Sequence, residues 1–147
     1  MGWRLWRGGA EPEVDSLRHA CLLPPCSPFC LSKSYKLAVV SDAWPSLENV
    51  FRAVGLRDYF SSFIISSQKG ITKPHELMYK TALEELGVLP EEAIFIDDNI
   101  KNCDGAMKLG INSFVLCRDF KSYIYHKIFK RNYTAIRSLK DINKLLR

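Results

Sequence analysis

The sequence predicts an α/β fold, in which a mostly parallel sheet is flanked by helices, over residues 34–147. Short β-branched and apolar runs alternate with amphipathic segments about ten residues long. Several of the amphipathic segments begin near a proline and end at a glycine, as helices often do. Strands joined by helices of this length form right-handed crossovers, so the strands are expected to pair in parallel.

Four segments have the composition of buried strands: residues 36–41, 63–65, 93–96 and 112–116. Helices are expected over residues 45–54, 74–86 and 100–109, followed in turn by Gly55, Gly87 and Gly110. A short amphipathic helix is expected over residues 139–146. The aromatic and basic stretch 120–133 fits neither pattern. This order predicts four parallel strands.

Residues 1–33 differ in composition from the rest of the chain. They are rich in Trp, Gly, Pro and Cys and show no sustained period. We therefore predict a separate leader over residues 1–33 that lacks regular structure and is loosely attached to the domain at 34–147. A disordered leader, a fusion scar and a misplaced reading frame would all produce such a break.

Composition limits the classes of function. The apolar share of 47% and the charged share of 25% are ordinary for a globular protein, and no apolar run reaches the ~18 residues of a membrane span. The net charge is +5, but residues 118–147 hold nine Lys or Arg against Asp119 and Asp141, which gives +7 there and −2 elsewhere. Such a basic tail can contact nucleic acid or anionic lipid. A solvated surface is the commoner explanation, so neither partner is expected.

The cysteines favour a reducing compartment. Cys103 and Cys117 lie in the periodic part of the chain and resemble small buried apolar residues, so a cytoplasmic location is expected. Cys21, Cys26 and Cys30 are spaced by five and four residues and have no fourth ligand nearby, which is a weak signal for zinc.

Polar side chains stand at the carboxyl ends of three predicted strands. Ser41 ends the first, Lys73 lies in the loop after the second, and Asp97 and Asp98 follow the third. Ligands of open parallel sheets bind at this edge. A hydroxyl and an ammonium suit a phosphoryl group, and two adjacent carboxylates suit a hard cation such as Mg²⁺. The pattern therefore predicts a site for phosphate and magnesium.

Three strings carry a resemblance to a known family. KLAVVSDAWPSL, GITKPHELMYKTALEELGV and AIFIDDNIKNCDGAMKLGI resemble, in order and spacing, the second, third and fourth motifs of the haloacid dehalogenase-like (HAD) hydrolases. Each string alone is common, but the three together are specific, and the resemblance covers residues 35–147. It implies a Rossmann-like three-layer sandwich and Mg²⁺-dependent hydrolysis of phosphate esters, as in a phosphatase.

The resemblance also implies roles for individual residues. Ser41 would bind the phosphoryl group, and Lys73 would stabilise the nucleophile and the transferred phosphate, so both count as catalytic. Asp42 occupies a variable position and would line the phosphate pocket. Asp98 would bind Mg²⁺, and Asp97 would either bind it too or hold Lys73.

Two residues further along resemble positions that orient the acidic loop from behind. They are Asn102 and Asp104, about one helical turn after the carboxylate pair.

The first motif of the family has no counterpart here. That motif is a strand followed by Asp-x-Asp, which supplies the nucleophile and the general acid. No Asp-x-Asp precedes Ser41, and Asp15, the one aspartate before Asp42, follows no apolar strand. The cap that the family often inserts is missing as well. Without the attacking carboxylate the covalent step cannot begin, and the Mg²⁺ site is weak or incomplete.

The missing strand belongs in the middle of the sheet. Its loss would leave two unpaired edges with buried N–H and C=O groups. The leader is a poor substitute, because Pro24, Pro25 and Pro28 interrupt its one apolar stretch. The two neighbouring strands must close up, another chain must supply a strand, or the product is unstable. Self-association through these edges is one expected outcome.

Two functional hypotheses follow. The first is a truncated HAD-like phosphohydrolase that acts, by ancestry, on a small phosphorylated metabolite and is inactive alone. The second is a non-catalytic phosphate-binding or regulatory module. Whether the chain is an enzyme stays open, and the substrate cannot be predicted because the family's specificity depends largely on the missing cap.

Overall fold

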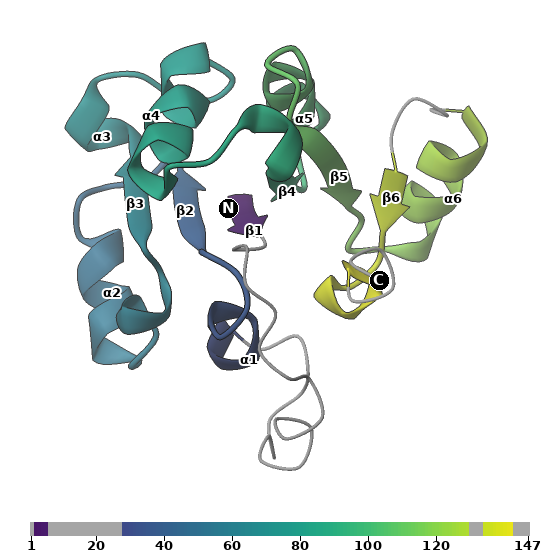
Figure 1. Cartoon of the computed structure of the whole chain (residues 1–147). Coiled ribbons are helices and arrows are strands. Elements are labelled where there is room, and N and C mark those ends of the chain that lie inside the picture. The colour runs from purple at the N-terminus through teal and green to yellow at the C-terminus, as the bar shows by residue number, and fades with distance from the viewer. Residues whose placement is uncertain (1, 6–27, 130–133, 143–147) are drawn as a thin grey trace.

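One six-stranded sheet organises the chain (Figure 1). The computed structural model describes residues 2–5, 28–129 and 134–142. The strands lie side by side in the order β3-β2-β1-β4-β5-β6. Their bounds are Gly2–Leu5 (β1), Ala38–Ser41 (β2), Ser62–Ile65 (β3), Ile94–Asp97 (β4), Asn112–Leu116 (β5) and Thr134–Ile136 (β6).

The four predicted strands are confirmed as β2, β3, β4 and β5. Strand β2 pairs in parallel with β3, and β4 pairs in parallel with β5. The prediction of four strands is too low, because β6 extends the parallel sheet beyond β5 and β1 lies in the middle. Strand β6 is three residues long and follows the aromatic stretch, so no period could mark it.

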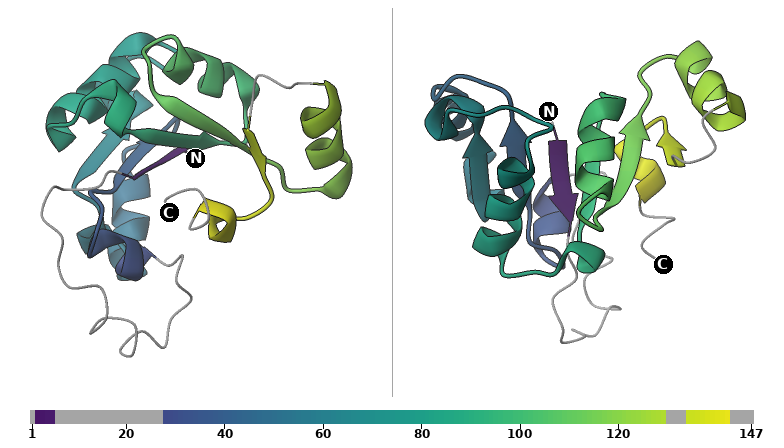
Figure 2. Two further views of the ribbon diagram at one scale, coloured as in Figure 1. Left: turned by 45° about the vertical axis from the view of Figure 1, so that its right-hand side comes forward. Right: turned by 90° about the horizontal axis from the view of Figure 1, so that it is seen from above.

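The expected gap in the sheet is filled by the beginning of the chain. Strand β1 runs antiparallel to both β2 and β4, with Trp3 opposite Val39 on one side and opposite Ile96 on the other. Figure 2 shows this strand, in purple, between the two halves of the sheet. The edges of β2 and β4 that we expected to be unpaired are therefore paired.

The expectation that residues 1–33 lack regular structure is wrong for two stretches. Strand β1 is one, and helix α1 (Pro28–Ser32) is the other. Sheet pairing uses backbone groups that every residue except proline carries in full, so a stretch of four residues, too short to show a pattern in the sequence, can complete a sheet. Residues 6–27 lie outside the described residues, and the domain boundary after residue 33 stays a prediction.

Side chains alternate between two cores on the two faces of the sheet. Val40 and Phe95 belong to one cluster, while Val39 and Ile96 belong to the other. The first cluster is covered by the helices α4 and α5, and the second by α2 and the segment around Ile142. The predicted three-layer sandwich is confirmed.

Three predicted helices are confirmed as α2 (Leu47–Ala53), α4 (Glu76–Leu86) and α5 (Ile100–Met107). Helices α3 (Ser66–Lys69) and α6 (Phe120–Phe129) were not predicted. Short 3-10 turns lie at Arg57–Tyr59, Pro90–Glu92 and Leu139–Asp141. Helix α4 ends at Gly87, whose φ of 62° is the left-handed conformation that glycine adopts at little cost.

The ends of the chain differ from expectation. The aromatic stretch that fitted no pattern forms α6, with an exposed polar and aromatic surface. Of the predicted helix over 139–146, the structure describes the turn Leu139–Asp141 and the buried Ile142, and residues 143–146 lie outside the described residues. No helix in the described part of the chain is long and apolar enough to cross a membrane.

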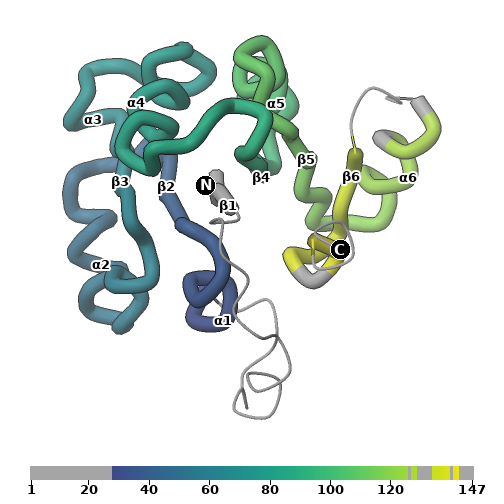
Figure 3. Tube along the Cα trace, in the orientation of Figure 1, coloured from purple at the N-terminus to yellow at the C-terminus, as the bar shows by residue number. Residues whose placement is uncertain are grey.

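Close packing at one glycine brings the loop before α4 onto helix α5. A Cβ on Gly105 would lie 2.7 Å from the Cβ of Pro74 and 2.9 Å from the carbonyl oxygen of Pro74. Only a residue without a side chain lets the loop lie this close. The chain path from β3 through α3 and α4 to β4, visible in Figure 3, is therefore held against α5 where it passes the end of the sheet.

Replacing the backbone donor of β1 tests whether the sheet needs this strand. We expect Arg4→Pro to lower the free energy of unfolding by at least about 1 kcal/mol, because proline cannot donate to a ladder. Chemical denaturation of Arg4→Pro beside Arg4→Ala, which keeps the backbone N–H, measures the difference. Equal stability of the two variants would show that β1 pairing contributes nothing.

Filling the contact at Gly105 tests the packing of the loop on α5. We expect Gly105→Ala to lower the free energy of unfolding by about 1–3 kcal/mol, since the added methyl group overlaps backbone atoms. Lys101→Ala, an exposed change in the same helix, is the control. A stabilised Gly105→Ala, the usual effect of alanine within a helix, would contradict the close approach.

Candidate functional site at the carboxyl edge of the sheet

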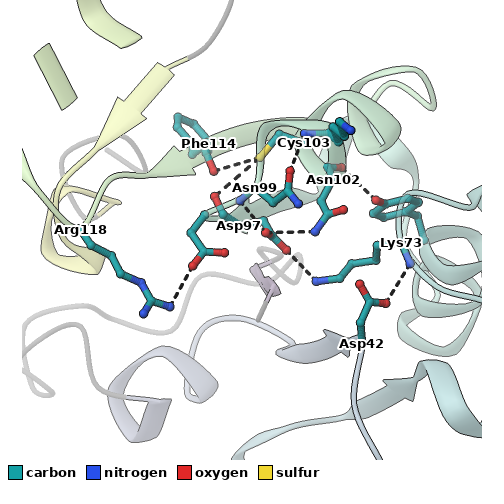
Figure 4. A network of polar contacts seen from close by, with 11 residues as sticks. Asp42, Lys73, Asp97, Asn99, Asn102, Cys103, Phe114 and Arg118 are labelled. Atoms are coloured by element: carbon teal, nitrogen blue, oxygen red, sulfur yellow. Dashed lines mark hydrogen bonds and ion pairs between the residues drawn. The ribbon is translucent and has the colours of Figure 1, made fainter. Parts of the chain in front are cut away.

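The predicted site residues come from three elements that meet at one edge of the sheet. Ser41 is the last residue of β2, and Asp97 is the last residue of β4. Lys73 lies in the loop before α4, held near this edge by the packing of Pro74 on Gly105. Figure 4 shows the polar contacts that join the loop to the end of β4.

A buried ion pair is the centre of the site. The Lys73 Nζ lies 2.7 Å from Asp97 Oδ2, and the two side chains are only 2% and 1% exposed. A buried charge needs both a partner of opposite sign and further hydrogen bonds. Of the two roles that the resemblance allowed for Asp97, the structure places its side chain against Lys73.

The second oxygen of Asp97 is held by the start of helix α5. Asp97 Oδ1 accepts hydrogen bonds from the backbone N–H of Asn99 at 2.8 Å and from Asn102 Nδ2 at 3.2 Å. Asn102 is itself fixed, because its carbonyl oxygen accepts a hydrogen bond from the Tyr79 hydroxyl at 2.9 Å. The carboxylate therefore has one orientation, set by two helices.

The environment of Asp97 favours its charged form. Burial alone raises the pKa of the carboxyl, but the Lys73 ammonium and the Asn99 N–H outweigh burial, so the pKa lies below its usual value. A lowered pKa contributes stability that is present above the unfolded-state value and is lost as the pH falls toward the folded-state value. Asp97 is therefore an anion at neutral pH.

Asp42 positions the backbone of the same lysine. Its Oδ1 accepts a hydrogen bond from the Lys73 N–H at 2.9 Å. Ser41, beside it, is buried at the end of β2. Lys73 therefore contacts the end of β2 through its backbone N–H, which binds Asp42, and the end of β4 through its ammonium group, which binds Asp97.

Asp98 turns away from this network. Its Oδ2 lies 2.8 Å from Arg118, and both side chains are partly or largely exposed. Arg118 follows strand β5, the neighbour of β4. The two adjacent carboxylates, Asp97 and Asp98, are thus separated by pairing with different cations.

The residues behind the acidic loop divide in the same way. Asn102 contacts Asp97 directly, whereas Asp104 lies half-buried on the outer turn of α5. Cys103, between them, is fully buried, and burial together with the Asp97 charge raises its pKa to about 12. Its thiol stays neutral, as expected for a structural cysteine.

The donors at this edge only partly fit a magnesium ion. Carboxylate oxygens are the ligands that Mg²⁺ prefers, but both oxygens of Asp97 are engaged and Asp98 is paired with Arg118. The described residues contain no group of three or more His, Cys, Asp or Glu that could hold a metal. A metal here would need Arg118 to release Asp98.

Strand β1 brings no carboxylate to this edge. Its residues, GWRL, are neutral or basic. Because β1 is antiparallel, Gly2 lies opposite Val40 near the site, while Leu5 lies opposite Ile94 at the far end of β4. Leu5, the last residue of β1, therefore lies at the edge of the sheet away from Ser41 and Lys73.

Three contributors to the site were not predicted from the sequence. Arg118 follows a predicted strand at the same edge, so the rule that identified Ser41 and Asp97 would have found it. Asn99 has a recognisable signal too, because it is the N-cap of α5 and its side chain accepts from the Lys101 N–H at 3.0 Å. Nothing in the sequence marks Tyr79, whose hydroxyl reaches Asn102 from the apolar face of α4.

Known proteins with similar sequences are phosphatases or carry the family name. The chain is 35% identical over 109 residues to a phosphoserine phosphatase of Thermus thermophilus, which covers 71% of this chain and 44% of that protein. It is 32% identical over 125 residues to a glyceraldehyde 3-phosphate phosphatase of Methanopyrus kandleri, covering 73% and 53%. It is 33% identical over 89 residues to haloacid dehalogenase-like hydrolase domain-containing protein 3 of mouse, covering 59% and 35%. The chain spans about a third to a half of the length of these relatives.

Solved structures share the fold. A HAD phosphatase from Thermococcus onnurineus superimposes with a TM-score of 0.67 at 26% identity, over 77% of this chain and 51% of that one. The L-2-haloacid dehalogenase from Xanthobacter autotrophicus has a TM-score of 0.60 at 24% identity, over 75% and 54%, which supports the fold alone.

The model of the haloacid dehalogenase-like hydrolases matches residues 30–110, more than half of the chain. This match covers the strand ends that carry Ser41 and Asp97 and the loop that carries Lys73. Together with the shared fold, it shows that the chain belongs to the haloacid dehalogenase-like hydrolase family.

Proposed function

We propose that this chain holds the phosphate-binding part of a phosphatase-type site and that, alone, it does not hydrolyse phosphate monoesters. The observation that carries the proposal is the buried Lys73–Asp97 pair, set beside a central strand that supplies no carboxylate. The pair fixes an ammonium at the carboxyl edge of the sheet, where phosphate ligands of such folds bind. Attack on phosphorus needs a nucleophile in addition.

Ser41 and Lys73 are the groups that would meet a phosphoryl oxygen. Ser41 has a hydroxyl at the end of β2, and its backbone neighbours lie at the same strand end. Lys73 has an ammonium with three N–H donors, of which Asp97 uses one. A hydroxyl and a partly satisfied ammonium stabilise negative charge, and more so as that charge grows during attack.

Asp42 is the nearest carboxylate that could replace the missing nucleophile. Its Oδ1 is already the acceptor for the Lys73 N–H, and it stands after β2 rather than between β2 and β4. A carboxylate displaced by even ~1 Å from the line of attack loses about a hundredfold in rate. Asp42 therefore orders the loop and does not attack.

The second candidate function is a non-catalytic module that binds a small phosphorylated molecule. The observation that favours it is that the binding groups stay fixed by a complete hydrogen-bond network without a nucleophile. A chain with this function would bind phosphate without hydrolysing phosphate esters, whereas a chain that has lost both activities would not bind phosphate. The substrate class of either function is a phosphate ester, by analogy with the phosphatases among the relatives.

We expect the purified chain to show no turnover of p-nitrophenyl phosphate with Mg²⁺ above the uncatalysed rate. The assay is run beside Asp42→Asn and Lys73→Ala, with an intact phosphatase of the family as positive control. Turnover abolished by Asp42→Asn would make Asp42 a relocated nucleophile and refute the proposal. Turnover lost only in Lys73→Ala would mean that water attacks directly in the pocket, which also refutes it.

Magnesium binding is expected in the millimolar range or weaker. The reason is that Asp98 must leave Arg118 and that Asp97 has no free oxygen, so few protein ligands remain. Isothermal titration calorimetry of the chain and of Asp98→Asn measures the effect. Glu48→Gln, another carboxylate in an ion pair with an arginine, is the matched control. Micromolar binding that survives Asp98→Asn would place the metal at a different site.

A further inference from the structure

A pocket with both polar and apolar lining opens at the same edge of the sheet, beyond the site described above. It has a volume of about 610 Å³ and lies where β6, helix α6 and the turn Leu139–Asp141 meet. Its lining consists of Arg118, Tyr123, Thr134, Ala135, Ile136, Arg137, Ser138 and Asp141. Cavities of this size commonly hold small organic ligands.

Two arginines reach the pocket because two parallel strands end together. Arg118 follows β5 and Arg137 follows β6, and these strands pair with Leu116 opposite Ile136. The backbone N–H of Cys117 donates to the carbonyl of Ile136 at 2.8 Å, which keeps the two strand ends aligned. Both guanidinium groups therefore lie at the carboxyl edge, where open α/β sheets bind ligands.

The one carboxylate in the lining is already engaged. Asp141 Oδ2 accepts hydrogen bonds from the backbone N–H of Arg137 at 3.1 Å and of Ser138 at 3.2 Å. The Asp141 carboxylate therefore stabilises the turn after β6. The side chains that line the pocket carry two positive charges against this one negative charge, and Asp98 pairs with Arg118 from outside the lining. An anion would therefore bind here by contacting Arg137 and by replacing Asp98 at Arg118.

Part of the remaining lining is apolar. Ile136 is buried beneath the pocket, and Tyr123 adds a half-buried ring from α6. The guanidinium of Arg137 lies 5.4 Å from the centre of the Phe120 ring, an arrangement that holds the planar fork in place. An apolar surface beside fixed guanidinium groups suits a ligand with both an apolar body and an anionic group.

We propose that this pocket binds a small organic phosphate, with its phosphate between Arg118 and Arg137 and its apolar body against Tyr123 and Ile136. A phosphate monoester has three terminal oxygens, so it can accept hydrogen bonds from two guanidinium groups at once. A carboxylate has only two oxygens, which a single guanidinium group can occupy. The pocket is separate from Ser41 and Lys73, and the proposal does not depend on the function proposed for them.

Arg118 links the two places. In the structure its guanidinium pairs with Asp98 at 2.8 Å, while the same side chain lines the pocket. A phosphate in the pocket competes with Asp98 for this guanidinium. Removing the Asp98 charge should therefore strengthen binding of the phosphate, while removing either arginine should weaken it.

Titration of the full chain with phenyl phosphate, followed by ¹H–¹⁵N NMR, tests the proposal. We expect the amide resonances of Arg137 and Ser138 to shift, with affinity about tenfold or more weaker in Arg118→Ala and in Arg137→Ala. Asp98→Asn should bind more tightly than the unaltered chain. Arg52→Ala is the matched control, because Arg52 is also exposed and paired with a carboxylate, and it should leave the affinity unchanged.

Two companion probes separate the parts of the ligand. Phenol should not bind, and inorganic phosphate should bind less tightly than phenyl phosphate.

Unchanged affinity in Arg137→Ala would overturn the proposal. Resonance shifts confined to Ser41 and Lys73 would also overturn it, because they would place the phosphate in the other site. Equal affinity for phenyl phosphate and inorganic phosphate would overturn the assignment of an organic ligand. Arg137→Lys, which keeps the charge without the fork, should bind with intermediate affinity.

Discussion

The backbone groups of β2 and β4 face each other across the middle of the sheet, and the rest of the molecule depends on how they are satisfied. These two strands carry Ser41 and Asp97 at their ends, so the distance between them sets the width of the site. With β1 between them, the strands stand two strand spacings apart, roughly 10 Å. Buried N–H and C=O groups need hydrogen-bond partners, and here the antiparallel strand β1 supplies them to both β2 and β4.

The ion pair of Lys73 and Asp97 then joins the two halves of the sheet across this spacing. Lys73 is tied to β2 by its backbone contact with Asp42, and to β4 by its side chain. Removing one partner would leave an uncompensated buried charge, which is strongly destabilising. The pair is thus part of the folded structure as much as part of a site.

Sequence patterns predicted the parts of the fold that depend on side chains. The strand ends at Ser41 and Asp97 followed from apolar runs with a polar residue after them, and Gly87 marked the end of α4. Strand β1 was not predicted, because GWRL is four residues long and the alternation of Trp3, Arg4 and Leu5 is too short to reveal a strand. The partner of Asp98 was not predicted either. The sequence does place Arg118 at the same edge, after a predicted strand, but its pairing with Asp98 depends on the register of β4 and β5, which sets Asp97 opposite Val115.

The direction of β1 has a consequence for how this chain could change over evolutionary time. Because the strand is antiparallel, Gly2 lies toward the end of the sheet that carries Ser41 and Asp97, and Leu5 lies at the opposite end. An acidic residue at Leu5 would therefore lie away from Lys73, and Gly2 is the position within GWRL where a substitution could place a carboxylate toward the site.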